Sequence, residues 1–195
     1  GNILVVVWEK KMIADAYAMG RSDIDQWSTS EMWSTAILEL NPVTGSIDWE
    51  WHLWDHLIQD VSPEFGAFYG NISDHPELFD INCGSVGNNA GGPQDPNGDW
   101  IHINSIDYNP DLDQIAISSR LQGEVYIIDH STTTEEAASH IGGNSGKGGD
   151  ILYRWGNPQN YGRGDTSDQI LNSQHSINWI PSGYPGEGNF IVFNN

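Results

Sequence analysis

The sequence predicts an all-β fold whose antiparallel strands form repeated groups of about four, which is the arrangement of β-propeller blades. Three observations carry this prediction. Apolar runs of strand length, bounded by turn residues, recur along the chain. A motif of two aromatic residues with a charge between them occurs at residues 47–51 (IDWEW) and again at 151–155 (ILYRW). Both copies follow a β-run that ends in a turn, so they take the same place in their groups.

The expected strands form three groups within one domain, residues 1–195. The predicted parts are the end of one blade (1–53), a long loop insertion (54–99), a full blade (100–156) and the start of the next blade (174–195). The chain begins and ends inside apolar β-runs, which would leave unpaired hydrophobic edges. We therefore expect a fragment of a longer chain, a partial propeller of about two to three blades.

Three segments interrupt the strand pattern. Residues 9–19 predict a short helix that stops at Gly20, because glycine readily adopts the left-handed conformation that ends helices. Residues 132–135 (TTTE) have the spacing of a capping box and predict a helical turn through Ala138. Residues 54–99 are rich in Gly, Asn, Asp and Pro. A loop of that length is either functional, on one rim of the scaffold, or a structural excursion.

The composition excludes several classes of partner. The chain carries 27 acidic and 7 basic residues, a formal net charge of −20, so we expect no nucleic acid and no membrane surface as partner. No apolar run approaches the roughly 18–20 residues that cross a bilayer. A hydrophobic content of 37% disfavours intrinsic disorder. The single cysteine, Cys83, excludes an internal disulfide and a cysteine-based zinc cluster, and it suits an oxidising compartment.

Three segments partly match metal-binding or nucleotide-binding motifs, but each lacks residues that the motif requires. Residues 142–149 (GGNSGKGG) lack the first glycine and the final Ser or Thr of a phosphate-binding loop. Residues 95–99 (DPNGD) resemble the start of a calcium loop but lack its later glycine and bidentate glutamate. His52 and His56 have no acidic or cysteine partner at metal-ligand spacing. We therefore expect no metal and no cofactor.

Two of the seven histidines stand apart by position, because His102 and His175 each open the first strand of a blade. First strands line the central channel of a propeller, so equivalent positions in successive blades point into one cavity. Arg120 ends the strand that pairs with the His102 strand. Guanidinium groups bind sulfate, phosphate or carboxylate oxygens through two parallel hydrogen bonds. Arg120 and the two histidines therefore predict an anion site, against the alternative that the histidines only pack the channel.

Several long segments resemble one known family, the bacterial arylsulfate sulfotransferases. The resemblance covers essentially the whole chain and is most specific from 99 to 195. The segments that carry it are 99–109 (DWIHINSIDYN), 117–120 (ISSR), 127–131 (IIDHS), 148–158 (GGDILYRWGNP) and 174–175 (QH). Because these motifs are long and occur in order, chance agreement does not account for them.

The resemblance implies a six-bladed propeller that is periplasmic or secreted. Such a protein moves a sulfuryl group from an aryl sulfate donor to a phenolic acceptor without the nucleotide donor PAPS. The transiently sulfated histidine of the family falls on His175, its His-x-Asn pair on His102 and Asn104, and its site arginine on Arg120. The chemistry then needs no metal, since fixed donors on these side chains stabilise the sulfuryl oxygens.

The family uses a further histidine from an earlier blade. By blade register that residue should precede Gly1, and His56 is a poor substitute. We therefore expect these 195 residues alone to be inactive. Two alternatives stay open: a non-catalytic propeller that binds a ligand or protein, and an aryl sulfate hydrolase on the same scaffold. The sequence also leaves room for a homo-oligomer.

Overall fold

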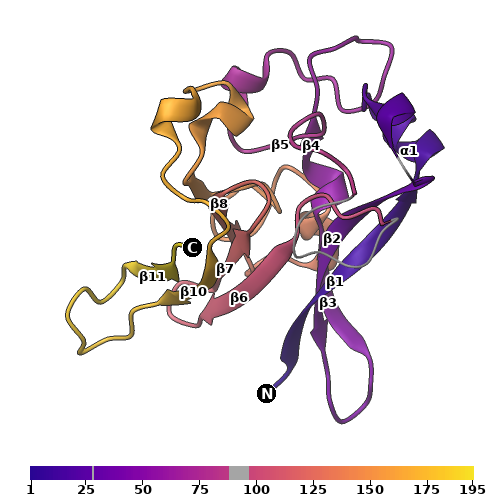
Figure 1. Ribbon diagram of the computed structural model, residues 1–195. Helices are drawn as coiled ribbons and strands as arrows, with labels where there is room; N and C mark the ends of the chain where they lie inside the picture. Colours follow the sequence, from indigo (N-terminus) through magenta and orange to yellow (C-terminus); the bar gives the residue numbers. More distant parts are fainter. Residues whose placement is uncertain (28, 88–96) are drawn as a thin grey trace.

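The computed structural model describes residues 1–27, 29–87 and 97–195, and its strands confirm the all-β class (Figure 1). One sheet is three-stranded, with β1 (Ile3–Met12), β2 (Glu31–Leu40) and β3 (Ile47–His52). A second is four-stranded, with β6 (Ile103–Asn109), β7 (Gln114–Ser119), β8 (Glu124–Asp129) and β9 (Tyr153–Trp155). The remaining pairs are β10 (His175–Trp179) with β11 (Phe190–Phe193), and β4 (Leu57–Ile58) with β5 (Phe79–Asp80). All pairs are antiparallel except β4–β5.

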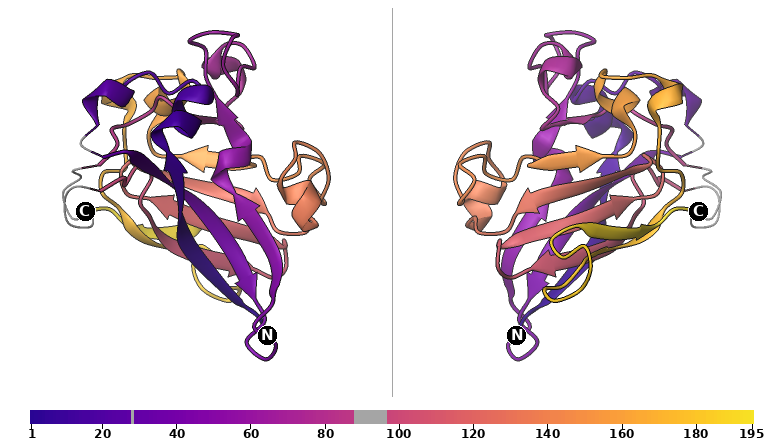
Figure 2. Two further views of the ribbon diagram at one scale, coloured as in Figure 1. Left: turned by 90° about the vertical axis from the view of Figure 1, so that its right-hand side faces the viewer. Right: turned by 90° about the vertical axis from the view of Figure 1, so that its left-hand side faces the viewer.

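The three-stranded sheet, the four-stranded sheet and the β10–β11 hairpin lie in successive layers, as both views of Figure 2 show. Side chains alternate between the two faces of a strand, and β7 and β8 are buried along almost their whole length. One face packs with Trp49 and Trp51 of the three-stranded sheet, whereas the other packs toward the β10–β11 hairpin. The residues of the first face are Ile115, Ile117, Tyr126 and Ile128, and those of the second are Ala116, Val125 and Ile127. The four-stranded sheet is therefore the central layer.

The first helix is shorter than the sequence predicts. Strand β1 continues to Met12, which pairs with Glu31, and α1 occupies only Ile13–Ala18. Lys10 and Lys11 belong to the strand because they form ion pairs with Glu31 and Glu9. The expectation of a helix from residue 9 is wrong, since those ladder and ion pairs favour the extended form.

The second helix forms one residue later than its motif suggested. Helix α2 (Thr134–Ala137) is capped by Thr133, whose hydroxyl accepts the Glu136 N–H at 3.2 Å. The Glu136 carboxylate accepts the Thr133 N–H in return, so the capping box joins Thr133 and Glu136 rather than Thr132 and Glu135. The single turns are η1 (Ile24–Gln26), η2 (Leu53–His56), η3 (Ile72–Asp74), η4 (Pro158–Tyr161) and η5 (Thr166–Asp168). Within the described ranges, no helix has the length and apolar character to cross a membrane.

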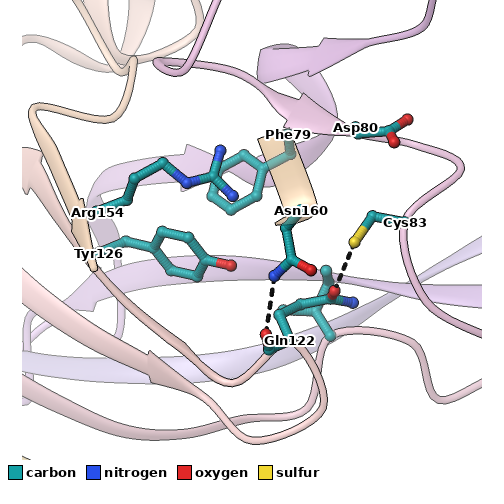
Figure 3. Close-up of a pocket in the computed structure, with 8 residues that line it drawn as sticks. Phe79, Asp80, Cys83, Gln122, Tyr126, Arg154 and Asn160 are labelled. Carbon is teal, nitrogen blue, oxygen red and sulfur yellow. Dashed lines mark hydrogen bonds between the residues drawn. The ribbon is translucent and has the colours of Figure 1, made fainter. Parts of the chain in front are cut away.

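The segment 54–99 carries more structure than a long loop, because β4, β5 and η3 lie within its described part. A buried arginine anchors it: Arg21 donates to the carbonyls of Ile81 and Gly84 and pairs with Asp23. Figure 3 shows a small cavity that this segment lines with Phe79, Asp80 and Cys83, and Cys83 donates to Gln122 at 3.0 Å. Burial raises the pKa of the Cys83 thiol to about 12, so this cysteine is a poor nucleophile at neutral pH.

Asp80, one of the residues that line this cavity, makes the folding stability depend on pH. Burial raises the pKa of Asp80 from 3.8 to about 6. An aspartate with a higher pKa in the folded state binds its proton more readily when folded, so its contribution to stability is lost as pH rises between those values. One pKa unit corresponds to about 1.4 kcal/mol. Because Asp80 keeps some contact with water, we expect its contribution to fall by about 2 kcal/mol.

We expect Asp80→Asn to remove this part of the pH dependence. Asparagine keeps the side-chain oxygen that accepts the Asn82 N–H at 2.8 Å and carries no charge. The measurement is the difference in free energy of urea unfolding between the two proteins, at steps from pH 4 to about pH 7. Other carboxylates titrate equally in both proteins and cancel. A difference that stays constant over this range contradicts the prediction.

Candidate functional site

His102 and Arg120 lie side by side at one end of the β6–β7 hairpin. Ile103 pairs with Ser119, and the Arg120 N–H donates to the His102 carbonyl at 3.1 Å. The Ser119 hydroxyl donates to the carbonyl of Ile101 at 2.6 Å. These bonds continue the hairpin ladder by one residue on each strand, so the hairpin register itself holds the two candidate residues next to each other.

A buried carboxylate orients His102. Nδ1 of His102 lies 2.6 Å from Oδ2 of Asp99, whose side chain is fully buried. Since the carboxylate accepts, Nδ1 carries a proton and the polar atom left for a ligand is Nε2. The His102 side chain is 17% exposed, so Nε2 can be reached from the surface.

Gln174 fixes the strand that carries His175. Its side chain is buried, and Nε2 lies within hydrogen-bond distance of the Ser119 carbonyl (2.7 Å) and the Glu124 carbonyl (2.9 Å). The carbonyl of Gln174 accepts a bond of 2.7 Å from Nδ2 of Asn104. Asn104 is thereby joined to the residue directly before His175. This link brings the His-x-Asn segment and the His175 strand together.

His175 presents one ring nitrogen without a protein partner in the described part of the chain. Nδ1 lies 2.9 Å from the Ser173 carbonyl, which can only accept, so Nδ1 is the protonated nitrogen. In the neutral ring, the lone pair is then on Nε2. The residue is half-buried at the start of β10. A neutral imidazole held by a backbone carbonyl is suited to act as a nucleophile through Nε2.

Backbone strain gathers at this end of the sheets. His102, Ser173 and Ser176 have φ of 51°, 52° and 59°, in the left-handed region that side chains other than glycine disfavour. The only other described non-glycine residues with positive φ are Ala67 and Asp113. The β10–β11 register also shifts between His175 and Asn178. Strained residues persist where the surrounding structure holds them, and they cluster at functional sites.

Arg120 is the arginine whose guanidinium is uncommitted in the described ranges. The chain has four arginines. Arg21 and Arg154 pair with Asp23 and Glu124, and Arg163 donates to the Ser73 carbonyl. The Arg120 side chain is half-buried and has neither a carboxylate nor a carbonyl partner among the residues that the structure describes. A partly buried cation without an internal partner is suited to bind an anionic group.

The four candidate residues, His102, Asn104, Arg120 and His175, are thus connected through hydrogen bonds that involve backbone groups. His102 contacts Arg120, and Asn104 contacts the residue before His175. No direct hydrogen bond joins their four side chains within the described ranges. His56 lies elsewhere: it is fully buried and bound to Asp150 and Ala137. The segment 95–99, which resembles the start of a calcium loop, falls partly outside the described residues.

Two supporting residues escaped the sequence analysis. Asp99 opens the same motif as His102, three positions earlier, and this spacing could have suggested the contact. Gln174 precedes His175, but its three acceptors lie 50 or more positions away, so no local signal points to them.

Comparison with known proteins gives one match. The family model described as Arylsulfotransferase (ASST) matches residues 13–195. No curated protein and no solved structure matches the chain.

Proposed function

The chain belongs to the arylsulfotransferase family, and on that premise we propose that it transfers a sulfuryl group from an aryl sulfate donor to a phenolic acceptor by way of a sulfated His175. The observation that carries the proposal is the state of the His175 ring. Its Nδ1–H is committed to the Ser173 carbonyl, which leaves Nε2 with a lone pair. PAPS takes no part in this proposal, because the donor is itself a sulfate ester.

The reaction has two balanced steps. In the first, Nε2 of His175 attacks sulfur, the bond between sulfur and the aryl oxygen breaks, and its electron pair leaves with the phenolate, which water protonates. In the second, the oxygen of the acceptor phenol attacks sulfur, the N–S bond breaks and the phenol proton passes to solvent. His175 returns to its neutral form, ready for another donor.

The neighbouring side chains supply donors to the sulfuryl oxygens, whose charge is redistributed during attack. Arg120 offers an uncommitted guanidinium, and His102, oriented by Asp99 through Nδ1, donates from Nε2 when its ring is protonated. Asn104 keeps one amide N–H beyond its bond to Gln174. Its Oδ1 is buried and without a hydrogen-bond partner among the described residues, and an acceptor phenol carries the donor that this oxygen lacks.

We propose further that the three layered sheets are parts of neighbouring propeller blades. The central sheet is a four-stranded antiparallel meander buried on both faces, as expected of a blade between two others. β10 lies against β6, and Ser105 and Asp107 of β6 accept the backbone N–H groups of Ile177 and Trp179. We assign the protein to the periplasm or the secreted fraction, in line with the family resemblance and the single cysteine.

The test is an assay of the protein that contains this chain, with p-nitrophenyl sulfate as donor. Release of p-nitrophenol that depends on added phenol, with formation of phenyl sulfate, supports transfer. Release that is independent of phenol indicates the hydrolase alternative. Binding without turnover indicates a non-catalytic propeller.

Arg120→Ala is expected to lower kcat about 10² to 10³-fold, the usual effect of losing one oxyanion donor. Arg163→Ala is the matched control, because Arg163 is exposed and donates to the Ser73 carbonyl, away from the candidate residues. Arg120→Lys should recover part of the rate, since it restores the charge without the planar fork. Single-turnover kinetics with p-nitrophenyl sulfate measures the effect. A rate within about 3-fold of wild type would remove Arg120 from the site.

A further inference from the structure

A second cluster of titratable side chains lies outside the candidate site. His56 at the end of η2, His140 after α2 and Asp150 before β9 come from three separate segments. Oδ1 of Asp150 lies 2.8 Å from Nδ1 of His56 and 2.7 Å from Nδ1 of His140. All three ligand atoms lie within 4.8 Å of one another. Two imidazoles and one carboxylate thus converge on one point.

The other ring nitrogens are already committed. Nε2 of His56 lies 2.8 Å from the Ala137 carbonyl, which can only accept, so His56 carries a proton on Nε2. Nε2 of His140 lies 3.2 Å from the Tyr69 hydroxyl, which can accept its proton. With the ring proton on Nε2, the Nδ1 lone pair of each ring faces the Asp150 carboxylate. A cation held by the three atoms then takes the place that a proton on Nδ1 takes in a plain hydrogen bond to Asp150.

From this arrangement we propose that His56, His140 and Asp150 bind a divalent transition-metal ion of the Zn²⁺ type. Metal-bound histidines commonly donate the distal ring N–H to a carbonyl or other oxygen, and Nε2 of each histidine here lies within reach of such an oxygen. Two imidazole nitrogens and one carboxylate oxygen favour Zn²⁺, Co²⁺ or Ni²⁺ over Ca²⁺ and Mg²⁺, which prefer oxygen alone. Three protein ligands leave a fourth tetrahedral position for water.

The His56 ring is tightly packed against its neighbours. Its ring stacks on Trp51 with centroids 5.7 Å apart, and the Trp51 indole donates to the Gly149 carbonyl at 2.8 Å. A Cβ on Gly149 would lie 2.6 Å from His56 Nε2 and 2.0 Å from the Ala137 carbonyl oxygen. Only glycine therefore allows this approach of the backbone directly before Asp150.

Access and geometry also suit an ion. His56 is fully buried, whereas the His140 side chain is 39% exposed, which gives an entry path from one side. Tetrahedral bonds of about 2.0–2.1 Å place ligand atoms about 3.3 Å apart. The two Nδ1–Oδ1 distances are shorter than this by about 0.5 Å, so binding requires a small retreat of the carboxylate or of the exposed His140 ring.

The bound ion would join distant parts of the chain. His56 follows β3 of the three-stranded sheet, and Asp150 lies 94 positions later, just before β9 of the four-stranded sheet. The sequence-based expectation of no metal rested on the lack of a ligand near His52 and His56. The other two proposed ligands, His140 and Asp150, are far from His56 in the sequence, and tertiary contacts bring them to it. The proposal does not depend on the proposed reaction at His175.

The test uses the chelator-treated chain titrated with Co²⁺, whose visible absorption reports tetrahedral nitrogen and oxygen ligation, followed by Zn²⁺ displacement. We expect one ion per chain and a rise in Tm of about 5 °C or more at saturating Zn²⁺. His140→Ala should weaken binding by more than about 100-fold, and Tyr69→Phe by about 10-fold, since an outer partner costs less than a ligand. His52→Ala is the matched control, because His52 pairs with Glu9 and Glu50 away from the cluster.

Circular dichroism of His140→Ala checks that this variant, altered at a partly exposed side chain, remains folded. Equal affinity in wild type and His140→Ala would overturn the proposal, as would the absence of saturable binding at one ion per chain. Nitrogen NMR of the His56 ring gives an independent reading. Zn²⁺ should shift the Nδ1 resonance, whereas a ring protonated on both nitrogens and unchanged by Zn²⁺ means that a proton takes the place of the ion and overturns the proposal.

Discussion

Replacement of His175 by alanine is expected to abolish sulfuryl transfer in the protein that contains this chain. The other candidate residues share the stabilisation of the sulfuryl oxygens, so the loss of one leaves the rest in place. A nucleophile has no such substitute, because without Nε2 no N–S bond can form. The matched control is His75→Ala, since His75 is a partly exposed histidine that pairs with Glu77 and contacts none of the candidate residues. The measurement is acceptor-dependent release of p-nitrophenol.

The covalent intermediate provides a second readout. Incubation with donor and no acceptor should leave a sulfated ring on the peptide 170–179, detected as added mass. Sustained turnover by His175→Ala would contradict a covalent step and favour direct transfer to the acceptor. A sulfated peptide that contains His102 instead would keep the chemistry and overturn the choice of nucleophile.

The strands could be predicted from the sequence because their pattern is local. In β7 and β8, runs such as 124–129 (EVYIID) combine β-branched and aromatic residues with nearby turn residues, and this combination favours buried strands. The aromatic residues of the motifs at 47–51 and 151–155 all lie in final strands of their sheets, β3 and β9. Where ladder pairing competed with helix propensity, as at residues 9–12, the prediction failed, since the partner strand lies beyond the local window.

The polar partners of the candidate residues could not be predicted in the same way. His102 and Arg120 are neighbours because a hairpin pairs them, and a hairpin is readable from a turn between two apolar runs. The bonds of Gln174 to Ser119 and Glu124 depend instead on how one sheet packs against the next. The same limit hid the partners of Arg154, which the sequence presents only as a charge between two aromatic residues.

Arg154 forms a buried ion pair across the four-stranded sheet. It lies on β9, and its guanidinium binds both carboxylate oxygens of Glu124 on β8, at 3.0 and 2.5 Å. The side chains are 6% and 0% exposed. The same guanidinium donates to the carbonyls of Pro76 and Leu78, and it lies 4.2 Å from the ring centroid of Tyr161. One side chain therefore joins the sheet, the segment before β5 and the η4 turn.

Arg154→Met is expected to lower the free energy of unfolding by about 3–5 kcal/mol, because it leaves the Glu124 carboxylate buried without its partner. The double variant Arg154→Met/Glu124→Gln should recover part of this loss, since it removes the uncompensated charge while the Gln side-chain oxygen can still accept from the Tyr126 hydroxyl and Asn160 Nδ2. Urea unfolding of wild type, both single variants and the double variant gives the coupling energy. Arg163→Ala, at an exposed arginine, is the control. A loss below about 1 kcal/mol for Arg154→Met, the range of surface ion pairs, would show that water reaches Glu124 once the arginine is gone.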